Sequence, residues 1–306
     1  AGDYKKAISI WQALNHRNAK NISFAKGCNL VDDDALIAKL NPHGAMLEKD
    51  KQTPQQLINE ALATAYKADV VVAVLGEPFG MSGEAASVTD IRLLENQRDL
   101  LRALKQTGKP IVLVLMNGRP LNLSWEDKNM DAILETWYSG TMAGPAITDV
   151  LYGDANPSGK ITMSFPVNVG QVPVYYNHEN TGRPLDPNQK YTTKYLDAPN
   201  DPLYPFGYGL SYSSYHYSDI TLSSPVLNPG DSITASVMIT NTGKRAGKET
   251  VQLYKRQLAG SISRPVKELI GFKQINLAPG QTVKVSFDIS VNDLKFYNSS
   301  LQFGYE

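Results

Sequence analysis

The sequence has few of the residue patterns that would point to a metal, a membrane or a nucleic acid. Cys28 is the single cysteine in 306 residues, so no disulfide can form within the chain, and we expect it to pack as a small apolar residue. No Cys/His cluster has the spacing of metal ligands, so no metal or cofactor is expected. No apolar run approaches the roughly 18 residues that cross a bilayer. Thirty basic residues balance thirty acidic ones, which favours neither nucleic acid nor membrane as a partner.

The first half of the chain, to about residue 164, alternates apolar strands with helical patterns. Such alternation predicts an α/β fold, a mostly parallel sheet with helices on both faces. The expected helices are Tyr4–Leu14, Pro54–Lys67, Ile91–Thr107 and Ala143–Tyr152, and the expected strands are Ile22–Ala25, Val70–Leu75, Ile111–Met116 and Ala132–Thr136.

The second half changes to a period of two. Apolar and polar residues alternate along Asp231–Thr240, Glu249–Tyr254 and Thr282–Ile289, with Gly-containing turns between them. This pattern predicts a β-sandwich of about six or seven strands, with the last hairpin cut short. We therefore expect an α/β domain at 1–164, an ordered connecting segment at 165–216 and a sandwich at 217–306.

The connecting segment is rich in Pro, Asn, Gly and Tyr, and flexible linkers are seldom so aromatic. Its aromatic rings have two interpretations. They could stack on sugar rings in a groove, or pack internally with their hydroxyls bound to backbone. The residues concerned are Tyr175, Tyr176, His178, Tyr191 and Tyr195.

The strand Val70–Leu75 runs directly into a loop that carries Glu77 and Glu84. Open α/β sheets place ligands at the carboxyl ends of their strands, so a carboxyl there is a candidate acid. The competing interpretation is a helix N-cap or a solvated charge. We expect Asp90 to be an N-cap, because it stands just ahead of the helical pattern Ile91–Thr107.

Four segments, in this order and spacing, resemble glycoside hydrolase family 3. They are Gly76-Glu77 with Met81-Ser-Gly-Glu84-Ala-Ala-Ser87 and Asp90-Ile91, then Lys109–Pro120, Gly153–Lys160 and Tyr204–Tyr212. Within the family the similarity is greatest to the periplasmic β-glucosidases of Gram-negative bacteria, and it includes Val172–His178 and Asn180–Pro184. Asn241–Gly247 resembles a block of the fibronectin type III-like domain of these proteins, so the resemblance covers essentially the whole chain.

The resemblance implies a periplasmic, retaining β-glucosidase that removes terminal non-reducing β-D-glucosyl residues from oligosaccharides or glucosides. Glu84 matches the family's general acid/base. The nucleophile would be an Asp on an N-terminal (β/α)₈ barrel whose segment is absent from this sequence. The chain therefore resembles the C-terminal part of a larger enzyme, with that barrel and the substrate as its partners, and we expect it to be inactive alone.

The remaining residues of the loop have expected roles as well. Gly83 lets Glu84 extend from a loop of small residues. Glu77, nearer the strand, would support the loop through a charge-assisted hydrogen bond to Arg119. Met81 is assigned as a substrate contact. Two alternatives stay open: a β-xylosidase or N-acetylglucosaminidase of the same family, and a stand-alone module that binds carbohydrate or protein.

Overall fold

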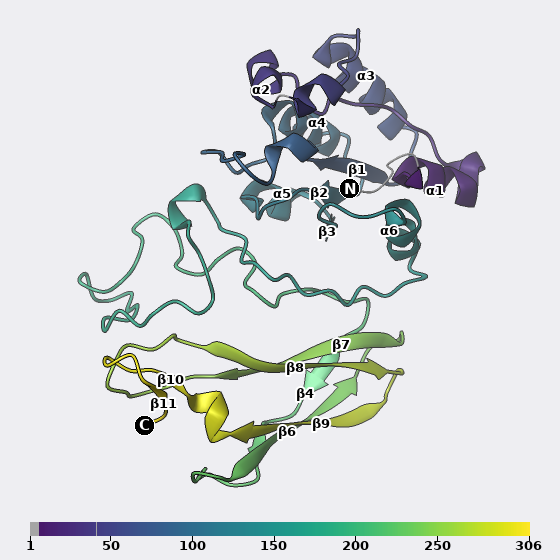
Figure 1. The fold of residues 1–306 in the computed structure, drawn as a ribbon. Coiled ribbons are helices and arrows are strands. Elements are labelled where there is room, and N and C mark those ends of the chain that lie inside the picture. The colour runs from purple at the N-terminus through teal and green to yellow at the C-terminus, as the bar shows by residue number, and fades with distance from the viewer. Residues whose placement is uncertain (1–5, 41) are drawn as a thin grey trace. The chain divides into compact units, whose positions relative to one another are not determined.

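The structure is a computed structural model that describes residues 6–40 and 42–306 (Figure 1). The chain forms two compact units. The first, the α/β unit, contains residues 1–152 and 165–172, and the second, the sandwich unit, contains 153–164 and 173–306. The expected limits at residues 164 and 216 stay a prediction, and the sequence pattern did not anticipate that 153–164 groups with the second unit.

The α/β unit is built on a parallel sheet of three strands in the order β1-β2-β3. Its strands are β1 (Val71–Gly76), β2 (Ile111–Met116) and β3 (Ala132–Glu135). Gly76 pairs with Met116, and Leu115 pairs with Glu135. The carboxyl ends of all three strands therefore lie along one edge of the sheet.

Helices cover both faces of this sheet, as the alternating pattern predicted (Figure 1). On one face, Val114 of β2 packs with Ile10 of α1 and Ile147 of α6. Leu113 and Leu115 point to the opposite face and are fully buried. The helices are α1 (Ile10–Asn18), α2 (Asp34–Lys39), α3 (Pro54–Ala65), α4 (Glu95–Lys105), α5 (Ser124–Asn129) and α6 (Ala143–Tyr152). Short 3₁₀ helices are η2 (Ala19–Asn21), η3 (His43–Met46), η4 (Phe79–Met81) and η5 (Val169–Gln171). None of the described helices has the length and apolar character that a membrane crossing requires.

The helix that follows β1 begins later than expected. α4 starts at Glu95, after Leu94, which supplies no side-chain cap. The prediction that Asp90 is an N-cap is therefore wrong. Its Oδ1 accepts a hydrogen bond from the backbone N of Arg92 at 3.0 Å, and its carboxylate binds the Arg92 guanidinium. The carboxylate is therefore occupied by a guanidinium two residues away, ahead of the helix.

Two other local predictions differ from the structure. Ile22–Ala25 is irregular rather than a strand, because an apolar β-type pattern forms a ladder only beside a neighbouring strand, and none pairs with it among the described residues. Phe24 is correspondingly 62% exposed. The first helix begins at Ile10, and Tyr4, where we expected it to begin, lies outside the described residues.

The sandwich unit confirms the period-two prediction. β6 pairs with β4, β5 and β9, β7 pairs with β8, and all pairs are antiparallel. Ile239, Val251, Leu277 and Val285, one from each long strand, form its core. The elements are β4 (Tyr215–Tyr217), β5 (Thr221–Leu222), β6 (Ser232–Asn241), β7 (Gly247–Lys255), β8 (Glu268–Leu277), β9 (Thr282–Ser290), η6 (Val291–Leu294), β10 (Phe296–Tyr297) and β11 (Phe303–Gly304).

The aromatic residues of the connecting segment do not behave alike. The Tyr176 ring stacks on Phe206 with centroids 4.3 Å apart, and its hydroxyl accepts a hydrogen bond from the backbone N of Leu269 at 3.3 Å. Tyr176 therefore packs internally. Tyr191 is 75% exposed, and Tyr175 and Tyr195 are exposed as well. Nδ1 of His178 lies 3.1 Å from the carbonyl of Glu179.

Candidate active site

The end of β1 is fixed before the following loop begins. Gly76 has φ +154°, and a Cβ there would lie 1.7 Å from the carbonyl oxygen of Met116, so only glycine fits. The fully buried side chain of Gln97 donates to the Gly76 carbonyl at 2.7 Å and accepts from the Gly76 amide at 2.9 Å. Residues 77–90, which we call the β1 loop, therefore leave the sheet from a rigid point.

Glu77, the first residue of the β1 loop, is buried in an ion pair. Its Oε1 lies 3.0 Å from Nε of Arg119, and its Oε2 accepts a hydrogen bond from the backbone N of Gly118 at 3.3 Å. Within the described residues, Nε of Arg119 has no hydrogen-bond partner. Its 3.0 Å contact with Oε1 of Glu77 is therefore an ion pair without the alignment of a hydrogen bond. Burial raises the pKa of Glu77, and the charge of Arg119 only partly offsets this effect.

Arg119 also binds the far side of the β1 loop. Its Nη2 donates to the carbonyl of Ala86 at 3.0 Å. The same guanidinium therefore contacts both the first residue of the loop and a residue beyond its turn. Between them, Ser82 Oγ donates to the Gly118 carbonyl at 3.3 Å. These bonds hold the base of the loop against the end of β2.

Glu84 lies at the tip of the turn that these contacts brace. The backbone on either side of it is left-handed, with φ +103° at Gly83 and +56° at Ala85. Its side chain is exposed, and within the described part of the chain it has neither a hydrogen bond nor an ion pair. Met81, in η4, is by contrast only 6% exposed. The turn thus presents one carboxyl to solvent and buries the neighbouring thioether.

The ends of β2 and β3 add two polar residues beside Glu77, the buried Asn117 and the half-buried Glu135. Asn117 is fully buried, and Glu135 Oε1 accepts a hydrogen bond from the backbone N of Trp137 at 2.8 Å. Burial raises the pKa of Glu135 to about 7, while the Trp137 amide and the Asn117 side chain act in the opposite direction. Sequence reasoning missed Glu135. The available signal was its position at the end of an apolar strand, which resembles the position of Glu77 directly after β1.

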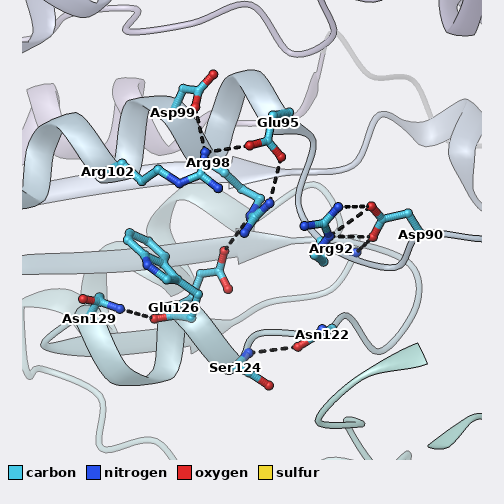
Figure 2. A network of polar contacts seen from close by, with 11 residues as sticks. Asp90, Arg92, Glu95, Arg98, Asp99, Arg102, Asn122, Ser124, Glu126 and Asn129 are labelled. Carbon is cyan, nitrogen blue, oxygen red and sulfur yellow. Dashed lines mark hydrogen bonds and ion pairs between the residues drawn. The ribbon is translucent and has the colours of Figure 1, made fainter. Parts of the chain in front are cut away.

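A network of charges follows the β1 loop on α4 and α5 (Figure 2). Arg98 lies between Glu95, whose Oε2 is 2.7 Å from its Nη1, and Glu126, whose Oε1 is 3.9 Å from its Nε. Glu126 is 1% exposed, and burial raises its pKa. Arg102 adds contacts to Glu95 and Asp99 on the exposed side of α4. The network thus links α4 to α5 through the ion pair of Arg98 and Glu126.

Other reactive groups in the described residues do not form a second site. No group of three or more His, Cys, Asp or Glu residues there is arranged to hold a metal ion. Cys28 is 9% exposed, and burial raises the pKa of its thiol to about 11. The thiol is therefore almost fully protonated at neutral pH, which suits a packing residue.

Comparison with known proteins places these features in a family. Residues 1–212 match the glycosyl hydrolase family 3 C-terminal domain, and residues 249–303 match a fibronectin type III-like domain. The chain is 53% identical over its whole length to a periplasmic beta-glucosidase of Salmonella typhimurium, of which it spans 40%. It is 42% identical over 96% of its length to a beta-xylosidase of Formosa agariphila, of which it spans 38%.

Solved structures agree with these relationships. The beta-glucosidase of Listeria innocua in complex with glucose superposes with a TM-score of 0.80 at 43% identity, covering 85% of this chain and 36% of that one. A mutant of the Listeria innocua enzyme in complex with laminaribiose gives 0.86 at 37% identity over the whole chain, which corresponds to 39% of the mutant. The chain thus spans about two fifths of these relatives, and it belongs to glycoside hydrolase family 3, carrying the C-terminal domain of that family together with a fibronectin type III-like domain.

Proposed function

We propose that this chain is the C-terminal part of a retaining β-glucosidase that releases terminal β-D-glucosyl residues from non-reducing ends. In this proposal Glu84 is the general acid/base, and an Asp on the barrel of the longer protein is the nucleophile. The observation that carries it is the exposed carboxyl of Glu84, which has no partner in the described part of the chain, on a loop whose base is braced by Arg119. Because no described residue holds this carboxyl, it is free to act on a bound substrate, and its match to the family's acid/base segment distinguishes it from an ordinary solvated charge.

The chemistry requires Glu84 to work in two steps. It first protonates the leaving oxygen while the nucleophile attacks the anomeric carbon, and it then takes a proton from the water that releases the sugar. The two carboxyls of retaining enzymes lie roughly 5–5.5 Å apart, so Glu84 has to reach the barrel pocket. Its place at the tip of a turn, with glycine before it, supports this reach.

The other loop residues would act through Glu84. Glu77 and Arg119 would hold the base of the β1 loop, and their ion pair supports that role. The proposed contact of Met81 with substrate has less support, because its side chain is 6% exposed. We therefore assign binding of the substrate mainly to the barrel.

The relatives support one alternative substrate. The beta-xylosidase of Formosa agariphila, at 42% identity, makes a β-xylosidase the second candidate. A stand-alone binding module has less support, because binding alone would not need a carboxyl presented at the tip of the β1 loop. The name of the Salmonella typhimurium relative supports a periplasmic location for the longer protein.

The proposal is tested by azide rescue in the full-length protein. Glu84→Ala should cut cleavage of cellobiose by about 10²–10⁴-fold, because its leaving group needs a proton. A dinitrophenyl glucoside should still form the glycosyl-enzyme, and added azide should restore turnover with a β-glucosyl azide as the product. Glu77→Ala is the matched control, since loss of a loop support opens no place for azide at the anomeric carbon.

Two results would contradict the assignment. Azide rescue of the Glu77 variant with none for the Glu84 variant would reverse the roles of the two carboxyls. Hydrolysis of an aryl β-glucoside by the 306-residue chain alone, at the rate of the full-length protein, would show that the chain needs no barrel nucleophile.

A further inference from the structure

The turn after β3 has an unusual backbone. Trp137 has φ +52°, a left-handed conformation that is rare for a bulky residue. The carboxyl of Glu135 accepts the Trp137 amide hydrogen at 2.8 Å, and the hydroxyl of Thr136 donates to the Leu115 carbonyl at 2.9 Å. Glu135 therefore holds the turn in a conformation that the chain would not otherwise favour.

That turn places Tyr138 against the start of the β1 loop. The hydroxyl of Tyr138 lies 3.1 Å from the carbonyl of Pro78 and 3.3 Å from that of Glu77, so it donates its single hydrogen between them. The Tyr138 ring also lies near that of Phe79, with centroids 6.3 Å apart. Contacts thus run from Glu135 through Trp137 and Tyr138 to the first residues of the loop.

The surroundings of Glu135 favour a neutral carboxyl. Among the described residues, its buried Oε2 has no hydrogen-bond partner, and neither has the buried Oδ1 of Asn117, whose Nδ2 donates to the Arg119 carbonyl at 2.6 Å. These two oxygen atoms are hydrogen-bond acceptors that lack a donor. A proton on Oε2 of Glu135 turns one of the two acceptors into a donor. The charged group that acts on Glu135 is Glu77, a like charge that is itself paired with Arg119. Burial, with a pKa of about 7, agrees with this arrangement.

We propose that Glu135 is a positioning residue for the β1 loop, holding the 135–138 turn through a neutral carboxyl so that Tyr138 fixes the backbone at Glu77 and Pro78. Its consequence for catalysis rests on the proposed role of Glu84. The positioning itself does not, because it concerns only contacts within the α/β unit.

Hydrogen exchange on the 306-residue chain tests the positioning. The reporters are the amides of Glu77, Met81 and Ser82, which donate to backbone carbonyls at the base of the loop. Glu135→Ala and Tyr138→Phe should each speed their exchange about 10-fold, the factor expected for one lost hydrogen bond. The double variant should be no faster than either single one, because both act through the same contacts.

Conservative replacement separates positioning from general stability. Glu135→Gln keeps an acceptor for the Trp137 amide and a donor in place of Oε2, so loop exchange should stay within about 2-fold of the unmodified chain. Glu126→Gln is the matched control, since it changes another buried carboxyl of the same unit that contacts Arg98 and not this turn. It should leave the reporter amides unchanged.

Three results would overturn the proposal. Exchange at the reporters could stay unchanged in Tyr138→Phe, Glu135→Gln could match Glu135→Ala, or the control could accelerate the same amides equally. Failure here is distinct from failure of the proposed function, which would appear as absent azide rescue of the Glu84 variant. In the full-length protein, Glu135→Ala should lower kcat/KM more for cellobiose than for a dinitrophenyl glucoside, and equal losses would count against positioning of Glu84.

Discussion

The two units treat their buried carboxyls differently. In the α/β unit, burial raises the pKa values of Glu77, Glu126 and Glu135 above the ordinary value of a glutamate. In the sandwich unit, the buried Glu249 accepts the Tyr217 hydroxyl at 2.8 Å and lies 3.5 Å from Nζ of Lys160. Each oxygen of Glu249 therefore has a hydrogen-bond or ion-pair partner, whereas Oε2 of Glu135 has no hydrogen-bond partner among the described residues.

This difference separates a carboxylate whose charge is paired in the folded protein from a carboxyl whose charge depends on pH. A buried carboxylate with both oxygens paired keeps its charge at pH values above its pKa, and removing it leaves its partners uncompensated. A buried carboxyl with too few donors has a raised pKa and is sensitive to small changes around it. Glu135 is such a carboxyl, and it lies at the end of β3 on the carboxyl edge of the parallel sheet.

The largest expected loss of stability comes from removing Glu249, the paired carboxylate of the sandwich unit. Glu249→Ala leaves the Lys160 ammonium and the Tyr217 hydroxyl without their shared partner, so the sandwich unit should lose about 3–5 kcal/mol of unfolding free energy. All three tryptophans, Trp11, Trp125 and Trp137, lie in the α/β unit, so unfolding of the sandwich should be followed by amide exchange in β6 and β7. The control is Asp288→Ala, an exposed carboxylate on β9, which should cost under about 1 kcal/mol. Equal losses of unfolding free energy from the two variants would show that the pairing of Glu249 contributes nothing special to stability.

The next effect is a dependence of α/β unit stability on pH. Glu135 has a folded pKa of about 7 and an ordinary value of 4.5, so its contribution is complete below pH 4.5 and is lost as pH rises through 7. The loss for Glu135 alone should be about 3 kcal/mol. Tryptophan fluorescence during urea unfolding at pH 5 and pH 8 measures it.

Glu135→Gln is the matched variant for that measurement. It should remove most of the difference between the two pH values, while the raised pKa values of Glu77 and Glu126 leave a residual loss of the same sign. In the sandwich unit Asp293 has a lowered pKa, chiefly because it accepts a backbone hydrogen bond at Ser290, so its contribution is lost as pH falls. A pH dependence of the same sign in both units would contradict the comparison.

The smallest effect concerns the brace of the β1 loop. Arg119→Lys keeps a positive charge near Glu77 and loses the donor to Ala86, so it should cost about 1 kcal/mol and speed proteolysis within 77–90. Arg102→Lys, which changes an exposed guanidinium of α4, should cost under about 0.5 kcal/mol and leave proteolysis unchanged. Slower cleavage of the Arg119 variant would refute the brace.

The sequence predicted the elements whose patterns are local and strong. The apolar runs of β1 and β2 and the alternation of β6 and β9 appear within one residue of their expected positions. Helix ends were harder to predict, because caps depend on competing partners. Asp90 has the chemistry of an N-cap, but it binds the guanidinium of Arg92 instead.

The candidate site was only partly predictable for a similar reason. The pattern singled out Glu77 and Glu84 because both follow an apolar strand, and the structure brings Glu77 and Arg119 together. Glu135 and Tyr138 were missed because their importance depends on the left-handed backbone at Trp137, which no propensity indicates. The assigned roles of Glu84, Glu77 and Met81 stay predictions.

The side chain of Gln97 has a further consequence for the edge of the sheet at β1, beside which no other strand pairs among the described residues. Its amide offers Gly76 an acceptor and a donor, as the peptide group of an adjacent strand would. Exposed edges invite pairing with foreign strands, and natural proteins limit this by occupying the edge. At Gly76 both backbone groups are already taken, so any strand that extends this sheet beside β1 has to stop short of the residue from which the β1 loop departs.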